Sequence, residues 1–280
     1  MATFEKPLCF IEIRLTGHKL YLMIIQSFGA SCCHSNQTRR ELFSHADLKF
    51  VKKFYPRLRA ITGHNINDPL QYSIPDPFYG TFLREPIART ISSYQASVLL
   101  GTNRASFEDS LKNRKGLNNH QVHFMAGEAN LDKAKRFLER CHFIGFTEKF
   151  NLSLKLFEKL APCPLNVNYK RLNSAKNNQI QTDLNADPRM VELARNHNRL
   201  DLELYDFALS EIFPKLCQKA GINPAEKVPS YELAEDNKQL NLLWGRFYNK
   251  VFRQIYKVRH KICYPTDADL AVVKTEDDPH

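Results

Sequence analysis

An arginine and a serine in this chain lie at a spacing that suits the binding of a phosphate group. Arg84 follows an apolar run that ends at Leu83, and Ser92 comes eight residues after Arg84. Pro86 favours a helix that begins just after Arg84, because a proline has no N–H to donate and is tolerated in a first helical turn. A guanidinium at a strand end and a hydroxyl on the next helix can together hold phosphate oxygens. A structural ion pair is the alternative role for Arg84.

The elements that would position these residues alternate along the chain. Apolar runs of strand length are found at residues 8–13, 60–62, 80–83, 142–145 and 165–168. Helical patterns are found at residues 20–28, 86–100, 106–113, 131–141, 150–160, 187–213 and 240–262. Residues 30–46 are polar, and we expect them to be irregular or helical. Short strands that alternate with helices predict an α/β fold with a mostly parallel sheet.

The chain divides into three expected parts. We expect one α/β domain over residues 1–222, a linker and a helix over residues 223–265, and a disordered tail over residues 266–280. One face of this C-terminal helix is apolar, with Leu243, Phe247, Val251, Ile255, Val258 and Ile262. Its other positions are basic, so we expect the apolar face to pack on the domain and the basic face to be solvated. The alternative is peripheral contact with a membrane or an acidic polymer.

The composition restricts the kinds of partner. The formal net charge of +10 favours an anionic partner such as a nucleotide, an acidic glycan, a nucleic acid or an anionic membrane. No recognisable nucleic-acid-binding motif is present, so we expect no nucleic acid partner. No apolar run has transmembrane length, and we do not expect the short apolar stretch at residues 20–25 to be a signal peptide, because no small-residue cleavage site follows a proper apolar core. The seven cysteines are scattered without metal-ligand spacing, which predicts reduced thiols, a cytoplasmic protein and no metal site.

Six segments, in chain order, resemble the sulfotransferase family that includes the heparan sulfate and uronyl 2-O-sulfotransferases. These carbohydrate O-sulfotransferases use 3′-phosphoadenosine 5′-phosphosulfate as the sulfuryl donor. The segments are residues 10–13, 62–64, 84–92, 118–127, 144–148 and 198–207. Arg84, Pro86 and Ser92 match the family's 3′-phosphate motif, whereas Glu85 replaces an aspartate. The resemblance covers roughly residues 8–213 and implies a P-loop-like sheet flanked by helices, with the C-terminal helix as an extension.

The resemblance also implies roles for single residues. Arg84 and Ser92 would hold the 3′-phosphate of the donor. His64 lies in the segment that resembles the one with the family's catalytic base, and a histidine can accept the proton of an acceptor hydroxyl near neutral pH. His120 and His123 would lie near the acceptor substrate. The family's reaction needs no metal.

The loop after the first predicted strand departs from the family. The family's run is Pro-Lys-Thr-Gly-Gly-Thr-Ser, and this chain has Arg14-Leu15-Thr16-Gly17-His18-Lys19-Leu20. Thr16 and Gly17 match, and the backbone N–H groups of such a loop can cradle the 5′-phosphosulfate, with His18 as a further donor. Leu15 replaces the lysine that neutralises the leaving oxygen, so Arg14 or Lys19 would have to supply that charge. If Arg14 and Lys19 are only solvent-exposed surface charges, the 5′-phosphosulfate site lacks this positive charge and is degraded.

A later basic stretch, residues 169–186, resembles a region that closes over the nucleotide in the related enzymes. Lys176 is its expected contact with the nucleotide.

The sequence therefore predicts an O-sulfotransferase that acts on a hydroxyl, expected to be that of a carbohydrate, with His64 as general base. The alternative is a non-catalytic protein of the same fold that binds a nucleotide or an anionic glycan. A nucleotide kinase is disfavoured because Gly-x-x-x-x-Gly-Lys-Ser/Thr is absent. The resemblance places the protein in the Golgi lumen if an N-terminal membrane anchor precedes this chain.

Overall fold

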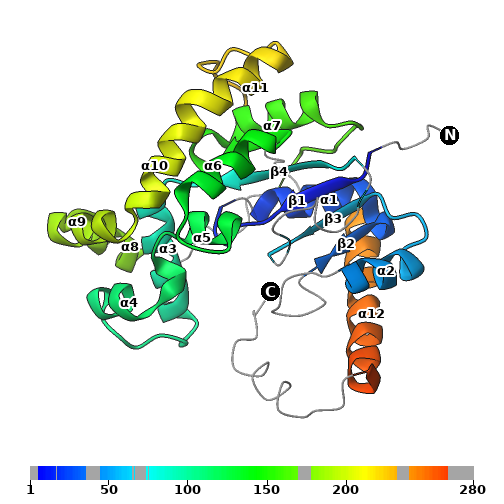
Figure 1. The fold of residues 1–280 in the computed structure, drawn as a ribbon, viewed down its shortest axis with the longest axis horizontal. Helices are drawn as coiled ribbons and strands as arrows, with labels where there is room; N and C mark the ends of the chain where they lie inside the picture. The colour runs from blue at the N-terminus through cyan, green and yellow to red at the C-terminus, as the bar shows by residue number, and fades with distance from the viewer. Residues whose placement is uncertain are drawn as a thin grey trace.

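Five parallel strands form one sheet, which confirms the predicted α/β fold (Figure 1). The computed structural model describes residues 6–16, 18–35, 45–64, 66, 74, 76–169, 178–231 and 240–263. The strands are β1 (Leu8–Ile11), β2 (Cys32–His34), β3 (Ala60–Gly63), β4 (Phe78–Leu83) and β5 (Phe143–Phe146). Their spatial order is β2-β3-β1-β4-β5, so β1 lies at the centre between β3 and β4.

Helices connect and cover these strands. Those in the first half are α1 (His18–Phe28), α2 (His45–Phe54), α3 (Pro86–Leu99), α4 (Phe107–Asn113), α5 (His120–Ala126) and α6 (Leu131–Arg140). Those in the second half are α7 (Phe150–Leu160), α8 (Gln179–Ala186), α9 (Pro188–His197), α10 (Arg199–Phe207), α11 (Phe213–Ala220) and α12 (Leu240–Cys263). Short 3₁₀ turns lie at η1 (Gly29–Ser31), η4 (Lys115–Leu117) and η5 (Thr147–Lys149), and a π-helical turn, η6 (Ala208–Ile212), joins α10 to α11.

Three predicted elements were wrong. Residues 32–34, expected to be irregular or helical, form the edge strand β2, which is too short to show a strand pattern. Residues 165–168, expected to be a strand, pair with no other strand, and the N–H of Asn166 donates to the Ser27 hydroxyl at 2.8 Å. The helix expected over residues 187–213 is interrupted at Asn198, whose side chain is buried in contacts with other helices.

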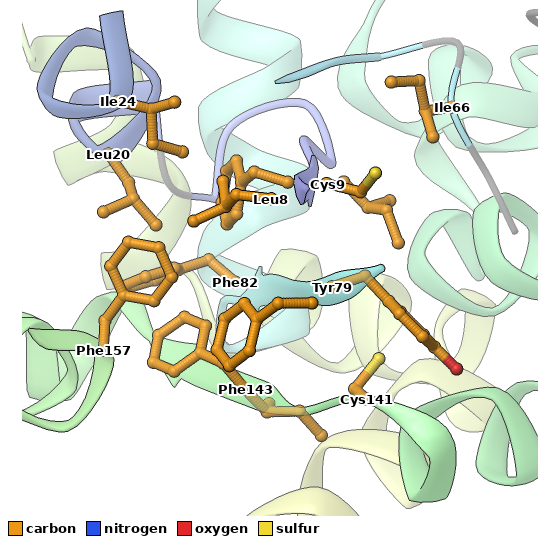
Figure 2. Close-up of a cluster of buried hydrophobic side chains, with 14 of the residues drawn as sticks. Leu8, Cys9, Leu20, Ile24, Ile66, Tyr79, Phe82, Cys141, Phe143 and Phe157 are labelled. Atoms are coloured by element: carbon orange, nitrogen blue, oxygen red, sulfur yellow. The ribbon is translucent and has the colours of Figure 1, made fainter. Parts of the chain in front are cut away.

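Side chains on the two faces of the sheet make the core. Figure 2 shows Phe82 of β4 on the same side as Ile24 of α1 and Phe157 of α7. Tyr79 points to the other side, where its ring lies 6.3 Å from that of Phe137 in α6. Residues at even and odd positions of a strand face opposite sides, which explains the division. Helices α1 and α7 therefore cover one face, and α6 covers the other.

Buried thiols contribute to this core. The described cysteines (Cys9, Cys32, Cys33, Cys141, Cys163 and Cys217) are all buried and form no disulfide. Burial raises the pKa of the Cys9 thiol to about 12, because a thiolate would lose its hydration there. Within the described ranges, no three His, Cys, Asp or Glu side chains are grouped as a metal ion would require.

The helix α12 packs on α1 and η1 at the β2 edge of the sheet, through a face other than the predicted one. The packed face includes Gly245, Asn249, Phe252 and Tyr256, which are all buried. A Cβ atom on Gly245 would lie 2.5 Å from Ile25, so only glycine permits this close approach. The predicted packing residues Leu243, Phe247 and Ile255 are exposed instead.

Asn249 attaches α12 to the edge strand. Its amide oxygen accepts the N–H of His34 at 2.8 Å and the hydroxyl of Tyr55 at 3.1 Å. Its amide nitrogen donates to the carbonyl of Cys32 at 3.0 Å. These bonds occupy backbone groups of β2 that would otherwise be available to another strand, which protects the sheet edge.

Candidate functional site

The loops that carry the predicted site residues meet at one edge of the sheet. All five strands are parallel, so their carboxyl ends lie at the same edge. The central strand β1 ends beside β3 and β4, and ligands of open α/β sheets bind at such a reversal of strand order. Figure 1 shows α3 and α5 at this carboxyl edge. Contacts between the loops identify the residues that share the site.

The described part of the first loop, residues 12–16, is held by contacts from the neighbouring strand ends. The N–H and the hydroxyl of Thr16 both donate to the carbonyl of Ile13, at 3.3 and 2.8 Å. The Thr147 hydroxyl, after β5, donates to the carbonyl of Thr16. Leu15 has a φ of +66°, an uncommon conformation for a residue with a side chain. The two donors of Thr16 are therefore used within the loop in this structure, and Thr16 as a nucleotide contact stays a prediction.

The structure describes the other expected residues of this loop to different extents. Arg14 is exposed in the loop, beside the histidines described below. His18 and Lys19 are the first two residues of α1, but their side chains lie outside the described part of the structure. Gly17 and Lys176 lie outside the described residues altogether.

His64 follows β3 and contacts the end of β1. Gly63 adopts a φ of +151°, which favours glycine, and turns the chain so that His64 reaches Glu12. The Nδ1 atom of His64 lies 2.7 Å from the carbonyl oxygen of Glu12. Because a carbonyl can only accept, Nδ1 carries the proton in the neutral ring and Nε2 carries the lone pair. His64 therefore presents the nitrogen that a general base needs.

A buried carboxylate lies next to this histidine. The Oε2 atom of Glu12 lies 3.9 Å from Nε2 of His64 and 3.5 Å from Nε2 of His34. Burial lowers the pKa of His64, and the Glu12 carboxylate opposes this shift by stabilising the protonated ring. The nearby Arg14 and His34 lower the pKa further. His64 is thus neutral at pH 7 and has a carboxylate close by to stabilise a proton that it accepts.

Arg84 links the end of β4 to the first loop and to α5. Its Nη1 donates to the carbonyl of Leu15 at 3.2 Å. Its backbone N–H donates to the Gln121 side chain at 3.1 Å, and its carbonyl accepts from the same amide at 2.9 Å. Burial lowers the pKa of Arg84, although the Glu148 and Glu85 carboxylates raise it. Its buried Nε has no hydrogen-bond partner within the described residues, so the guanidinium retains donors for a ligand.

Ser92 lies two turns into α3 and is partly exposed. The contacts of Arg84 given above go to Leu15 and Gln121, so the structure joins Arg84 to the first loop and not to Ser92. Glu85 occupies the N-terminus of α3, where its carboxylate accepts the N–H groups of Ile87 at 3.1 Å and Ala88 at 2.7 Å. Glu85 thus acts as a helix cap.

His120 and His123 lie on α5, which is fixed by reciprocal caps with α10. The buried Asp201 of α10 accepts the N–H groups of Gln121 at 3.0 Å and Val122 at 2.8 Å. In return, the Asn119 side chain before α5 accepts the N–H groups that begin α10. Each helix end thereby satisfies backbone donors of the other. Asn198, which accepts the N–H of Asn119, and Asp201 are therefore the residues that position α5.

The two histidines of α5 differ in their surroundings. His123 is exposed, whereas Nε2 of His120 is buried without a hydrogen-bond partner in the described part of the chain. Burial lowers the pKa of His120 well below its ordinary value, and the charges of Arg89 and Arg14 and the neighbouring His64 lower it further. His120 is therefore close to His64 and to these arginines.

Two residues that sequence reasoning missed complete the site. Arg89, on the first turns of α3, is fully buried and donates to the carbonyl of Gly116 at 3.1 Å. Burial lowers its pKa to about 10, and the charge of Asp201 opposes the shift. Glu148, after β5, accepts the N–H of Glu85 at 3.0 Å and the hydroxyl of Tyr205 at 2.9 Å. The sequence carried no distinguishing signal for Arg89, because its neighbours one turn further along α3, Ser92 and Ser93, are polar.

We expect His120 to make the protein less stable in acid. The folded protein keeps His120 neutral, whereas the unfolded chain binds a proton below the ordinary pKa of 6.5. Stability is therefore complete above this pH and falls as the pH drops toward the folded pKa, by about 1.4 kcal/mol per pH unit. In His120→Gln, the difference in Tm between about pH 7.5 and about pH 5.5 should be smaller than in the wild type. His197→Gln, at a partly exposed position outside the site, is the control, and an unchanged difference in His120→Gln would contradict the prediction.

The charged and titratable side chains at the carboxyl edge could bind an anion and accept a proton. Three arginines (Arg14, Arg84 and Arg89) lie near two histidines (His64 and His120) at the carboxyl edge. Such a cluster can bind a multiply charged anion. The lone pair of His64 Nε2 can accept a proton from a bound hydroxyl.

No protein-family model matches this chain, and no curated protein matches it significantly.

Proposed function

We propose that this protein is an O-sulfotransferase that moves a sulfuryl group from 3′-phosphoadenosine 5′-phosphosulfate to a carbohydrate hydroxyl. The main support is that the segments resembling the sulfotransferase family contact one another at one edge of the sheet. Arg84 bonds to Leu15 and Gln121, and Gln121 bonds to Asp201. Glu148 bonds to Glu85 and to Tyr205. These contacts bring segments that are far apart in the sequence together at one edge of the sheet, which supports the proposal.

The donor would bind between the first loop and α3. Arg84 would hold the 3′-phosphate with its remaining N–H groups, because a guanidinium matches phosphate oxygens in geometry and charge. Ser92 lies eight residues after Arg84, two turns into α3. It would contact the same phosphate if the bound nucleotide reaches that far along the helix. Arg14, in the first loop, is the described cation nearest in sequence to the missing lysine, and it would stabilise charge on the leaving oxygen.

The acceptor hydroxyl would lie beside His64. Its oxygen attacks the sulfur of the donor while Nε2 of His64 takes the hydroxyl proton. The new bond joins sulfur to the acceptor oxygen, the bond from sulfur to the phosphate oxygen breaks, and 3′-phosphoadenosine 5′-phosphate leaves. His64 becomes positively charged, and the Glu12 carboxylate 3.9 Å away stabilises that charge. His120 lines the same region and would contact the acceptor.

Glu12→Gln is expected to shift the pH dependence of turnover. Because the Glu12 carboxylate raises the pKa of His64, its removal should lower that pKa further. A base works when unprotonated, so the acidic limb of the kcat/KM profile should move to lower pH, and the maximal rate should fall because the protonated ring is less stable. A profile with unchanged position would show that Glu12 does not act on the base.

A non-catalytic nucleotide-binding protein is the alternative, and one observation favours it. Leu15 stands in place of the family's lysine, and the donors of Thr16 are used inside the loop. Leu15→Lys discriminates between the two functions. A large gain in turnover would indicate that the natural loop is impaired, whereas an unchanged rate would indicate that Arg14 or Lys19 already supplies the charge.

The experiment that tests the proposed activity is sulfuryl transfer from ³⁵S-labelled donor to desulfated heparan and chondroitin glycans. Label in the glycan, with release of 3′-phosphoadenosine 5′-phosphate in equal amount, would support the proposal. Tight donor binding without transfer to any glycan or simple alcohol would favour the non-catalytic alternative.

A further inference from the structure

The helix α12 exposes a row of large apolar side chains. Leu243, Trp244, Phe247 and Ile255 are 55%, 56%, 58% and 41% exposed. With about 100° between successive residues of an α-helix, they lie on the side opposite the packed residues Gly245, Asn249, Phe252 and Tyr256. Trp244 and Phe247 are in contact as an edge-to-face pair with ring centroids 6.0 Å apart. We call this row the apolar face of α12.

Basic residues flank the apolar face. Arg246, Lys250 and Arg253 are exposed and lie between the apolar face and the packed face on one side of the helix. The whole of α12 contains no aspartate or glutamate over its 24 residues. A helix with an aromatic apolar face beside a row of cations matches the chemistry of an anionic lipid surface, where rings enter the headgroup region and cations meet phosphates and carboxylates.

We propose that α12 docks the protein on an anionic lipid surface, with the helix lying in the plane of the membrane and its apolar face inserted. None of the described helices is long and apolar enough to cross a membrane, so the contact is peripheral. Figure 1 shows α12 on the side of the sheet away from α10 and α6, and its C-terminal half extends beyond the sheet. The surface belongs to α12 and is independent of the proposed sulfotransferase activity.

Two other occupants fit the observations less well. A second copy of the chain, with its α12 packed antiparallel about a two-fold axis, would bring the row of Arg246, Lys250 and Arg253 close to the same row of its partner, and like charges repel. A soluble acidic polymer would satisfy the cations but would leave Trp244 and Phe247 in water. Only a surface that is both anionic and apolar accounts for both features.

The chain contains a single tryptophan, Trp244, which makes the test direct. The full-length protein is mixed with phosphatidylcholine vesicles, with or without about 30% phosphatidylserine. We expect a blue shift of Trp244 emission and co-sedimentation with the anionic vesicles, and both should weaken with salt. Binding to the neutral vesicles should be at least about tenfold weaker.

Matched variants separate the two features of the helix. Leu243→Ser with Phe247→Ser retains the fluorescent probe and should weaken binding about tenfold or more, whereas Leu99→Ser with Leu100→Ser removes equally exposed side chains elsewhere and should not. Arg246→Glu with Lys250→Glu should abolish the preference for anionic vesicles. Arg104→Glu with Lys112→Glu, which changes the net charge equally, should weaken binding much less.

Three results would overturn the proposal. The first is no blue shift and no sedimentation with anionic vesicles. The second is equal loss of binding in the α12 variants and in their controls. The third is emission that is already blue in vesicle-free buffer, because another segment or a second copy then covers the face; sedimentation equilibrium would identify a dimer. None of these results bears on donor binding at the carboxyl edge of the sheet.

Discussion

Replacing His64 with alanine is expected to lower the rate of sulfuryl transfer by about 10²–10⁴-fold while leaving the affinity for 3′-phosphoadenosine 5′-phosphate nearly unchanged. The reason lies in the tautomer that the structure imposes. The carbonyl of Glu12 holds the proton on Nδ1, so Nε2 is ready to accept a proton, and burial keeps the ring neutral at pH 7. Alanine would remove the proposed base without removing a proposed donor to the nucleotide.

The controls for His64→Ala separate a lost base from a lost fold. His197→Ala removes a partly exposed histidine at the end of α9 that is not among the proposed site residues, and it should retain full activity. His64→Gln keeps a side chain of similar size that can donate to Glu12, but it cannot take up a proton near neutral pH, so it should be nearly as inactive as alanine. Turnover retained in either His64 variant would exclude this residue as the base.

Replacing Arg84 with alanine is expected to weaken binding of 3′-phosphoadenosine 5′-phosphate by about tenfold to hundredfold, the loss that a hydrogen-bonded charge commonly causes. Adenosine 5′-phosphate, which lacks the 3′-phosphate, should lose little affinity. Arg84 lies at the end of β4, with a buried Nε that has no partner in the described residues and a single contact from Nη1 to Leu15. Its remaining donors are the reason to expect a phosphate beside it.

The same substitution also removes the hydrogen bond from Arg84 to the carbonyl of Leu15 in the first loop. Comparing the affinities for the two nucleotides detects the effect of this loss. Equal losses for both nucleotides would mean that Arg84 acts by holding the loop, and its assignment to the 3′-phosphate would then be wrong. Arg84→Lys should give an intermediate loss, since an ammonium retains the charge but not the planar fork. Arg104→Ala, at an exposed position outside the site, should change neither affinity.

Most of the fold was predictable because its signals are local. The run Leu8–Ile11 is a continuous apolar strand, Pro86 begins α3, and Ser106 and Asp187 cap helices by accepting N–H groups. The edge strand β2 was missed because three residues carry no period, and its formation depends on pairing with β3. Residues 165–168 were wrongly predicted as a strand for the opposite reason. Their apolar residues Leu165 and Val167 are buried, but the segment pairs with no strand in the described part of the chain.

The face of α12 was predicted wrongly for a related reason. Periodicity identifies an apolar stripe but does not show that the protein covers it. The packed face is chosen by fit: Gly245 permits close approach to Ile25, and Asn249 satisfies the backbone of β2. A glycine and an asparagine give no hydrophobic signal, so the sequence pointed to the stripe that remains exposed.

The candidate site was predictable only in part. Arg84 and His64 stand beside strand ends, where sequence position alone places them at one edge of the sheet. The contacts that position them were not predictable, because Glu12, Gln121 and Asp201 act through pairings that join distant segments. Arg89 was missed because a single arginine within a helix has no distinguishing spacing.

The most direct test of the proposed function is a calorimetric titration of the purified protein with 3′-phosphoadenosine 5′-phosphate, with ATP as the control ligand. We predict binding at about micromolar concentration, selective over ATP, because Arg84 is proposed to contact the 3′-phosphate that ATP lacks. Failure of the folded protein to bind this nucleotide, or equal binding of ATP, would contradict the proposed function.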